Sequence, residues 1–121
     1  MDKITENKVN SIVRFLQEKK GEDIDIIDIT GKTSYADVLV LCSGANDIHI
    51  QALADHVLRQ CRVEKIRLLG KEGLKAAEWI LLDYGEIIVH IFHPDTRMLY
   101  DLEDLWQQRA AIIERIEVSY D

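Results

Sequence analysis

The sequence predicts a single α/β domain over residues 1–121, in which one mixed β-sheet is covered by helices. A chain of 121 residues suits one hydrophobic core and is cramped for two. Hydrophobic residues make up 47% and charged residues 31% of the chain, as in ordinary soluble globular proteins. Segments of helical periodicity also alternate with β-branched runs, and no internal repeat, low-complexity tract or linker divides them.

The N-terminal part of the chain is predicted to form one helix and two strands. Residues 24–29 are rich in β-branched side chains and predict a strand, and the cluster at 31–34 predicts a turn. Residues 36–41 are apolar on both alternating faces after Asp37, as in a central strand covered on each side. Gly21 is placed to end the preceding helix in a left-handed C-cap. That helix is predicted from apolar residues at helical spacing, namely Val9, Ile12, Val13 and Leu16.

A second helix is predicted from a long apolar stripe. Asn46 and Asp47 are suited to cap it. Residues 63–69 after it predict another strand, which the glycines of 70–73 interrupt. The apolar stripe that predicts the helix consists of Ile50, Leu53, Ala54, Val57, Leu58 and Cys61.

A β-hairpin is predicted closer to the C-terminus. Residues 79–83 and 86–92 flank Tyr84-Gly85, which makes the natural two-residue loop. Pro94, the only proline, ends the second strand. Asp101 is placed to N-cap a short C-terminal helix that carries Leu102, Leu105 and Trp106.

The two faces of this hairpin differ in composition. With Tyr84-Gly85 as the loop, Leu82 faces Ile87 and Trp79 faces His90. The first face is expected to meet the helices, and the second to form a partly exposed binding patch or to be covered in part by the C-terminal helix. The aliphatic face carries Ile80, Leu82, Ile87, Val89 and Ile91, and the mixed face carries Trp79, Leu81, Asp83, Glu86, Ile88, His90 and Phe92.

The charge and the apolar runs exclude several classes of protein. A net charge of -7 disfavours a surface that follows nucleic-acid phosphates or anionic lipid, and it suits a basic protein partner. The apolar run at 38–42 is bounded by Asp37 and Ser43, so no membrane span is expected. Residues 1–6 resemble neither a signal peptide nor a transit peptide, which indicates a cytoplasmic protein.

Catalytic and metal-binding chemistry has little support from local motifs. Cys42 and Cys61 lack the spacing of a zinc site or a disulfide framework, so buried, reduced thiols are expected. Asp25 and Asp28 fall on opposite faces of one strand, as solvated edge residues do. The His90 and His93 pair is a poor metal clamp for the same reason, and so is the pair formed by His49 and His56, two helical turns apart.

The Ser43-Gly44-Ala45-Asn46 segment leaves a second reading open. It lies between a buried strand and a helix N-terminus, where backbone N–H groups can bind a phosphate. A single glycine is not a phosphate loop, so a tight strand-to-helix turn is favoured. No catalytic residue, cofactor or metal is therefore expected.

Four segments, taken together, resemble the ribosomal silencing factor family RsfS, also called Iojap. They are ADVLVLCSG at 36–44, KEG at 71–73, WILLDYGEIIVHIF at 79–92 and RMLYDLEDLW at 97–106. The resemblance runs through nearly the whole chain in order, and the W-x-L-L-D-Y-G-x-x-x-V-H-x-F block is specific to the family. It implies a nucleotidyltransferase-like α/β fold without a catalytic site.

The resemblance also implies a function and a binding surface. Family members bind the large ribosomal subunit through its fourteenth protein and block association with the small subunit, lowering translation when nutrients are short. Neither a membrane nor a specific nucleic-acid sequence is an implied partner. Trp79 and Tyr100 are the expected anchors, and Asp83 is expected to pair with a basic residue. The implied partner-binding residues are Trp79, Leu81, Asp83, His90, Arg97 and Tyr100.

Two alternatives come from other classes of function. One is a nucleotide-binding or nucleotidyltransferase-like enzyme that uses the Ser43-Gly44 turn and Asp25. The other is a homodimer that buries the Trp79 face against a second copy.

Overall fold

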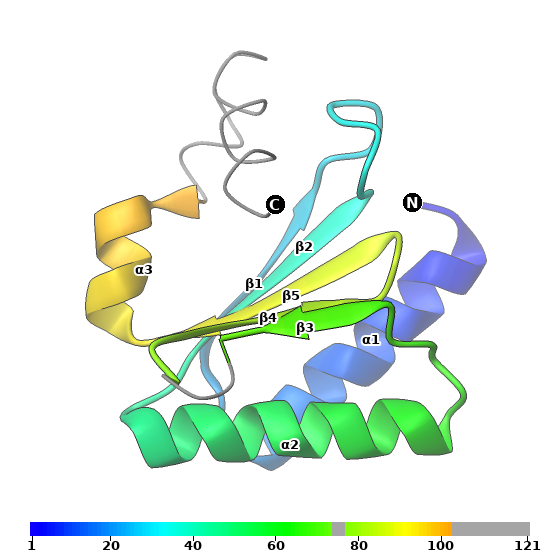
Figure 1. The fold of residues 1–121 in the computed structure, drawn as a ribbon. Helices are drawn as coiled ribbons and strands as arrows, with labels where there is room; N and C mark the ends of the chain where they lie inside the picture. The colour runs from blue at the N-terminus through cyan, green and yellow to red at the C-terminus, as the bar shows by residue number, and fades with distance from the viewer. Residues whose placement is uncertain (74–76, 103–121) are drawn as a thin grey trace.

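The fold is one mixed β-sheet with two long helices packed on the same face (Figure 1). The structure is a computed structural model that describes residues 1–73 and 77–102. Within these residues the sheet has five strands in the order β1-β2-β5-β4-β3. This arrangement confirms the predicted mixed α/β class. The helix predicted after Asp101 falls on residues 103–121, apart from Leu102, and so lies outside the described residues.

The two central strands run parallel and are buried along their whole length. They are β2 (Val38–Ser43) and β5 (Ile87–Phe92). The predicted central strand at 36–41 is thereby confirmed. β1 (Glu22–Asp28) pairs antiparallel with β2 and forms one edge of the sheet. β4 (Trp79–Asp83) pairs antiparallel with β5, and the short β3 (Gly70–Glu72) forms the other edge.

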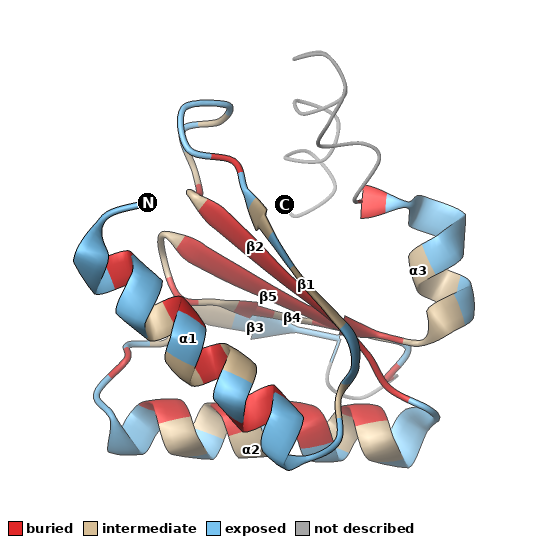
Figure 2. Cartoon of the chain, turned by 180° about the vertical axis from the view of Figure 1, so that it is seen from behind, coloured by how far each residue is buried: buried red, intermediate tan, exposed pale blue. Residues whose placement is uncertain are grey.

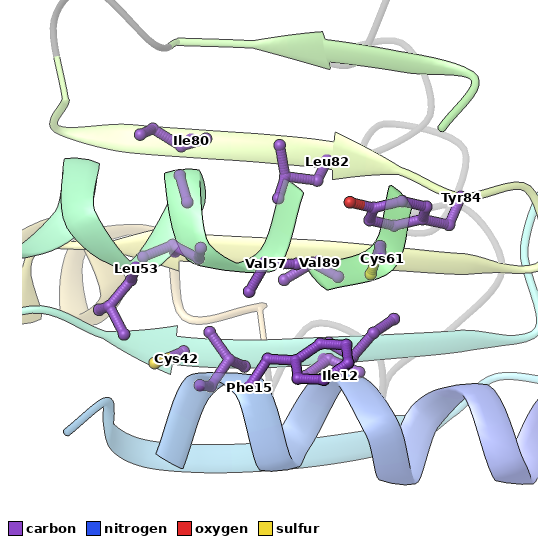
Figure 3. Packing of buried hydrophobic residues seen from close by; sticks show 14 of the residues in the cluster. Ile12, Phe15, Cys42, Leu53, Val57, Cys61, Ile80, Leu82, Tyr84 and Val89 are labelled. Atoms are coloured by element: carbon purple, nitrogen blue, oxygen red, sulfur yellow. The ribbon is translucent and has the colours of Figure 1, made fainter. Parts of the chain in front are cut away.

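Helices α1 (Lys3–Glu18) and α2 (Asp47–Val63) bury their apolar faces against the sheet (Figure 2). Each helix begins at a residue whose side chain accepts a backbone N–H: Asp2 in α1 and Asn46 in α2. Five of the six predicted stripe residues of α2 are buried, and Leu58 packs against the same core. Figure 3 shows this core, in which Ile80, Leu82 and Val89 of the sheet meet residues of both helices. The aliphatic hairpin face therefore meets the helices, as predicted.

Gly21 is required for close packing, and the prediction that it ends the first helix as a left-handed C-cap is wrong. The left-handed residue after α1 is Lys20, with φ of 59°. The Gly21 N–H donates to the Leu16 carbonyl at 2.8 Å, which closes the helix end. A Cβ at position 21 would lie 2.6 Å from Sγ of Cys42. The glycine is thus needed because the chain passes directly over β2.

The hairpin loop lies one residue further along the chain than predicted. Tyr84 N–H donates to the Ile87 carbonyl at 2.9 Å, so Gly85 and Glu86 are the two central loop residues. Gly85 has φ of 89°, as the first central position of a type II′ turn requires. Trp79 consequently pairs with Phe92 and not with His90. Because each partner moves by two residues, the strand residues keep their predicted faces. Glu86 is the exception: it lies in the loop, outside β5, and its carboxylate pairs with Lys8 of α1 at 3.0 Å, so its prediction on the mixed face is wrong.

Three further differences between the predicted and observed elements lie next to turns: a strand that does not form, a helix that was not predicted, and the position of Asp101 at a helix end. The strand predicted at 63–69 is wrong, because α2 continues to Val63 and β3 begins only at Gly70. A third helix, α3 (Pro94–Tyr100), was not predicted. Pro94 ends the preceding strand as expected, but it also begins this helix, where its fixed φ and missing N–H are favourable. Asp101 is the left-handed C-cap of α3, with φ of 46°.

The contact between Gly21 and Cys42 gives a prediction about stability. We expect Gly21→Ala to lower the free energy of unfolding by about 1–3 kcal/mol, because the added methyl overpacks the core. Gly70→Ala is the matched control, since a Cβ there meets nothing within 4 Å. It should change stability by less than about 1 kcal/mol. Urea unfolding of the three proteins measures both values, and equal midpoints for the two variants would contradict the packing argument.

Candidate functional site

Helices α1 and α2 leave the other face of the sheet free (Figure 1). That face carries the mixed set of side chains predicted from the hairpin, apart from Glu86. Leu39 and Leu41 of β2 and Ile88 and Phe92 of β5 are buried there. Trp79 and Leu81 of β4 are half-buried and pack against them. This face is therefore apolar at its centre and becomes accessible toward β4.

Four rings form a cluster at the end of this face nearest α3. We call Trp79, His90, Phe92 and Tyr100 the aromatic cluster. The centroid of Trp79 lies 5.7 Å from those of His90 and Phe92 and 4.7 Å from that of Tyr100. His90 and Phe92 are fully buried, whereas Tyr100 is 50% exposed. Trp79 thus lies between a buried floor and an exposed rim.

His90 holds the Trp79 indole by a hydrogen bond. Nε1–H of Trp79 donates to Nδ1 of His90 at 2.8 Å. The accepting role of Nδ1 assigns the proton of the neutral ring to Nε2. Burial lowers the pKa of His90 to about 3, so the ring is neutral near pH 7. In this position His90 orients Trp79, and the fully buried side chain exposes no surface to a partner.

Helix α3 adds exposed apolar side chains beside Trp79. His93 N-caps the helix by accepting the Asp95 N–H at Nδ1, at 3.2 Å. Met98 and Leu99 are 79% and 78% exposed and adjoin Tyr100 in the chain. Sequence reasoning missed both residues because Pro94 was taken only as the end of a strand. Recognised as a helix start, the same proline predicts that the run 97–100 lies on a helix.

Arg97 fastens α3 to the ends of β1 and β2. Its Nη1 donates to the backbone oxygen of Asp23 at 2.6 Å and to the hydroxyl of Ser43 at 2.9 Å. The guanidinium carbon also lies 5.7 Å from the centroid of the Phe92 ring. The arginine that the resemblance implies as a partner contact is therefore engaged inside the protein, where it fixes the position of the exposed helix.

Asp83 lies apart from the aromatic cluster, whereas Leu81 pairs with His90 across β4 and β5 and packs on the same face. Asp83 is at the far end of β4, four residues from Trp79, which is about 13 Å along a strand. Its Oδ1 accepts the Gly85 N–H at 2.8 Å, so the half-buried carboxylate also supports the hairpin turn. Of the six residues implied by the resemblance, the structure brings together Trp79, His90 and Tyr100, with Leu81 paired to His90 and Arg97 behind the cluster.

The turn that the enzyme alternative requires has the N–H groups of Gly44 and Ala45 engaged within the protein. Gly44 N–H donates to the Phe92 carbonyl at 3.0 Å, and Ala45 N–H donates to Nδ1 of His49 at 2.9 Å. A Cβ on Gly44 would lie 2.5 Å from Cγ1 of Ile50, so the turn is also closely packed. These contacts occupy two of the N–H groups that a phosphate bound at this turn would need.

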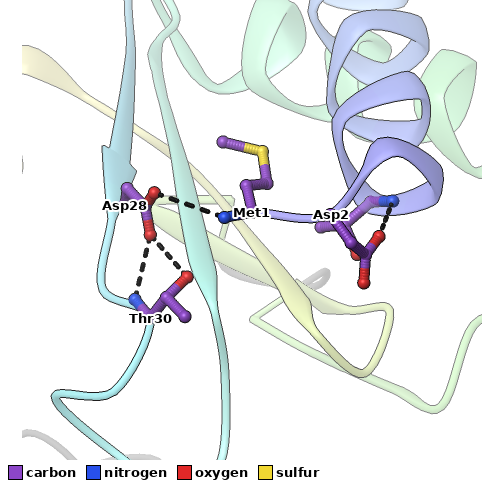
Figure 4. Close-up of polar contacts among 5 residues, drawn as sticks. Met1, Asp2, Asp28 and Thr30 are labelled. Atoms are coloured by element: carbon purple, nitrogen blue, oxygen red, sulfur yellow. Dashed lines mark hydrogen bonds and ion pairs between the residues drawn. The ribbon is translucent and has the colours of Figure 1, made fainter.

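The carboxylates and thiols considered as metal ligands have other roles. Asp28 Oδ1 accepts the Thr30 hydroxyl and N–H, and Oδ2 lies 3.8 Å from the N-terminal ammonium (Figure 4). The hydrogen bonds from Thr30 lower the pKa of Asp28. Cys42 and Cys61 are buried and unpaired, as expected, and burial raises their pKa values to about 12 and about 11. Within residues 1–73 and 77–102, no group of three or more His, Cys, Asp or Glu is arranged to hold a metal ion.

The helices of the described residues are α1, α2 and α3. Of those in the described ranges, none combines the length and the apolar character needed to cross a bilayer.

Comparison with known families matches residues 2–120 to the family described as ribosomal silencing factor during starvation, RsfS. The chain belongs to the RsfS family. A ribosomal silencing factor RsfS from Haemophilus influenzae is 38% identical over 100 residues, covering 79% of this chain and 98% of that protein. A mouse protein named mitochondrial assembly of ribosomal large subunit protein 1 is 29% identical over 105 residues, covering 84% of this chain and 46% of that protein.

A solved structure confirms the fold of this RsfS-family chain. A crystal structure of a protein from Chromobacterium violaceum superposes with a TM-score of 0.82 at 29% identity. The match covers 86% of this chain and 87% of that one.

The buried His90 predicts a pH dependence of stability in this RsfS-family chain. An unfolded histidine has a pKa near 6.5, so between pH 6.5 and about 3 the unfolded state takes up a proton that the folded state excludes. The stability that neutral His90 contributes is therefore complete above pH 6.5 and is lost as the pH falls. Between pH 7 and pH 5 this loss should reach about 2 kcal/mol.

Urea unfolding at several pH values measures this effect against His90→Asn, which has no titrating ring. The carboxylates titrate in both proteins, so the difference between the two isolates His90. Parallel curves between pH 7 and pH 5 would contradict the burial of a neutral imidazole.

The Trp79–His90 hydrogen bond predicts slow exchange of one indole proton. Trp79 Nε1–H should be protected in the wild type and should exchange at least tenfold faster in His90→Leu, which lacks an acceptor. His90→Asn can place an oxygen near the position of Nδ1 and should retain part of the protection. NMR measures the exchange, with Trp106→Phe assigning the indole signals. Fast exchange in the wild type would show that the hydrogen bond does not persist in solution.

Proposed function

We propose that this protein is a ribosomal silencing factor that binds the large ribosomal subunit in the cytoplasm through its fourteenth protein. By occupying that surface it blocks the small subunit from joining, and so lowers translation under nutrient limitation. The observation that carries the proposal is membership of the RsfS family across residues 2–120. The name of the mouse relative refers to the large subunit, which supports that choice of subunit.

The exposed side of the aromatic cluster suits a protein partner. Aromatic residues and methionine are enriched at the centres of protein interfaces, and Trp and Tyr are frequent hot spots. Here Trp79 and Tyr100 are in ring contact, and Met98 and Leu99 extend the apolar surface along α3. We call Trp79, Met98, Leu99 and Tyr100 the docking surface. Isolated exposed apolar residues are common, but the exposed Tyr100 in contact with the half-buried Trp79, with Met98 and Leu99 exposed on the same short helix, supports an interaction site.

The charge of the chain supports a basic partner. A net charge of -7 steers the protein toward a basic ribosomal protein and raises the rate of association at low salt. Asp83 lies beyond the aromatic cluster on the same face, where its carboxylate can pair with a basic side chain at the rim of the interface. Such rim pairs affect the association rate more than the affinity.

The six implied residues divide into three roles in this proposal. Trp79 and Tyr100 contact the partner directly. His90 and Arg97 position them, His90 through the indole hydrogen bond and Arg97 by holding α3 against β1 and β2. Leu81 packs beside His90 and supports the apolar face, and Asp83 lies at its margin. Because blocking needs only occupied space, the proposal requires no bond to be made or broken in a substrate.

Co-sedimentation with separated ribosomal particles tests the docking surface. The wild type should pellet with large subunits and not with small subunits, and it should reduce the fraction of joined ribosomes. Trp79→Ala and Tyr100→Ala should each weaken binding by about 30-fold or more, the equivalent of about 2 kcal/mol. Ile48→Ala is the control, since Ile48 is an exposed apolar residue of α2 and should bind like the wild type.

The outcomes distinguish the alternatives. If the wild type stays in the supernatant with every particle, the ribosome is not the partner. Binding that survives both aromatic substitutions would move the interface elsewhere on the chain. A mass that rises with concentration and is reduced by Trp79→Ala would favour the homodimer, and saturable nucleotide binding lost in Asp25→Ala would favour the enzyme.

A further inference from the structure

Positive charge is concentrated in one segment of this acidic chain. Residues 59–71 contain five Lys or Arg residues and a single acid, Glu64, which gives the segment a net charge of +4 in a chain of -7. The average charge therefore hides a local basic region. This segment runs from the last turns of α2 to β3, next to the hairpin turn.

The C-terminal end of α2 gathers three of these cations around one pocket. Lys65 adopts the left-handed conformation, with φ of 60°, and the next N–H, of Ile66, donates to the Cys61 carbonyl at 2.8 Å. This reversal buries Ile66 in the core and returns the chain toward the helix. A pocket of about 250 Å³ results, lined by Leu58, Arg62, Lys65, Ile66, Arg67, Leu68 and Tyr84.

The three cations are available to a ligand. Arg62, Lys65 and Arg67 are exposed, and none forms an ion pair with a described residue. Glu64, the acid between them, pairs with Arg14 of α1 at 2.8 Å. The C-terminal end of a helix carries about half a negative charge, which is small against three positive side chains. No acid is among the described residues that line the pocket, so these residues give it a net positive charge.

We propose that this basic pocket binds phosphate groups of an RNA backbone. Arg and Lys at exposed positions neutralise phosphates, and Arg adds bidentate hydrogen bonds. The apolar wall formed by Leu58, Ile66 and Tyr84 suits the sugar next to a phosphate. The choice of RNA among phosphate ligands rests on the proposed ribosomal function. The contact is independent of sequence, because no base edge needs to be read.

The basic pocket is separate from the docking surface. Tyr84 belongs to the core on the helix side of the sheet, whereas Trp79 packs on the opposite face. The two residues also flank opposite ends of β4. One surface can therefore meet a protein while the other contacts RNA, and substitutions can test each alone.

A short single-stranded RNA tests the basic pocket without the ribosome. At low salt, the RNA should shift amide NMR signals of residues 62–68, and two unrelated RNA sequences should bind similarly. The triple variant Arg62→Gln, Lys65→Gln and Arg67→Gln should bind at least tenfold more weakly. The matched control, Lys3→Gln, Lys19→Gln and Lys32→Gln, removes the same charge from exposed positions elsewhere and should bind like the wild type. Circular dichroism confirms that both variants are folded.

The results separate this proposal from the proposed function. Equal weakening in both triple variants, or no RNA binding by the wild type, would overturn the basic pocket whether or not the protein binds ribosomes. Inorganic pyrophosphate that shifts the same signals while RNA does not would also overturn the assignment to RNA. If large subunits bind, the slope of log affinity against log salt should flatten by about 2 to 3 units in the pocket variant only.

Discussion

The parallel pairing of β2 with β5 is the constraint on which the rest of the fold depends. Parallel strands cannot be joined by a tight turn, so the chain between them must cross the sheet. Helix α2 makes that crossing and covers one face, and β3 and β4 then extend the sheet beyond β5. Because they are parallel, the C-terminal ends of both central strands lie at the same end of the sheet. The segments that follow them are thereby neighbours, which is why Arg97 of α3 reaches Ser43.

The sequence predicts those parts of the fold that depend on periodicity and burial. The apolar stripe of α2 and the fully apolar β2 are correct because each burial pattern follows directly from the spacing of side chains. Errors arise at turns, where one backbone conformation decides the outcome. The hairpin loop shifted because Gly85 takes the first central position, and the strand expected at 63–69 failed because Lys65 reverses the chain after α2. The alternation of polar and apolar residues specifies neither the position of the hairpin loop nor the reversal at Lys65.

The sequence predicts which face of the sheet carries the candidate site, but not how deeply each of its residues is buried. Strand alternation places Trp79, Leu81 and His90 on one side, yet it cannot show that His90 is buried under the indole. Contacts between distant parts of the chain are equally hidden: the Arg97 side chain bonds to a carbonyl 74 positions away. Burial and contacts of this kind depend on the three-dimensional structure. The total charge of -7 likewise does not show the local charge of +4 at residues 59–71, which is read from the positions of the cations along the chain.

The hydrogen bond between Trp79 and His90 couples the amino-acid substitutions that the two positions tolerate. A phenylalanine at 79 would leave the buried Nδ1 without its donor, and an apolar residue at 90 would leave the indole N–H without its acceptor. A protein with only one of the two positions replaced is therefore less stable. Replacing both positions by apolar residues avoids the cost of an unpaired buried group. The pair should consequently be retained or exchanged together in a lineage, and a residue tolerated at position 90 in one relative can be harmful in another.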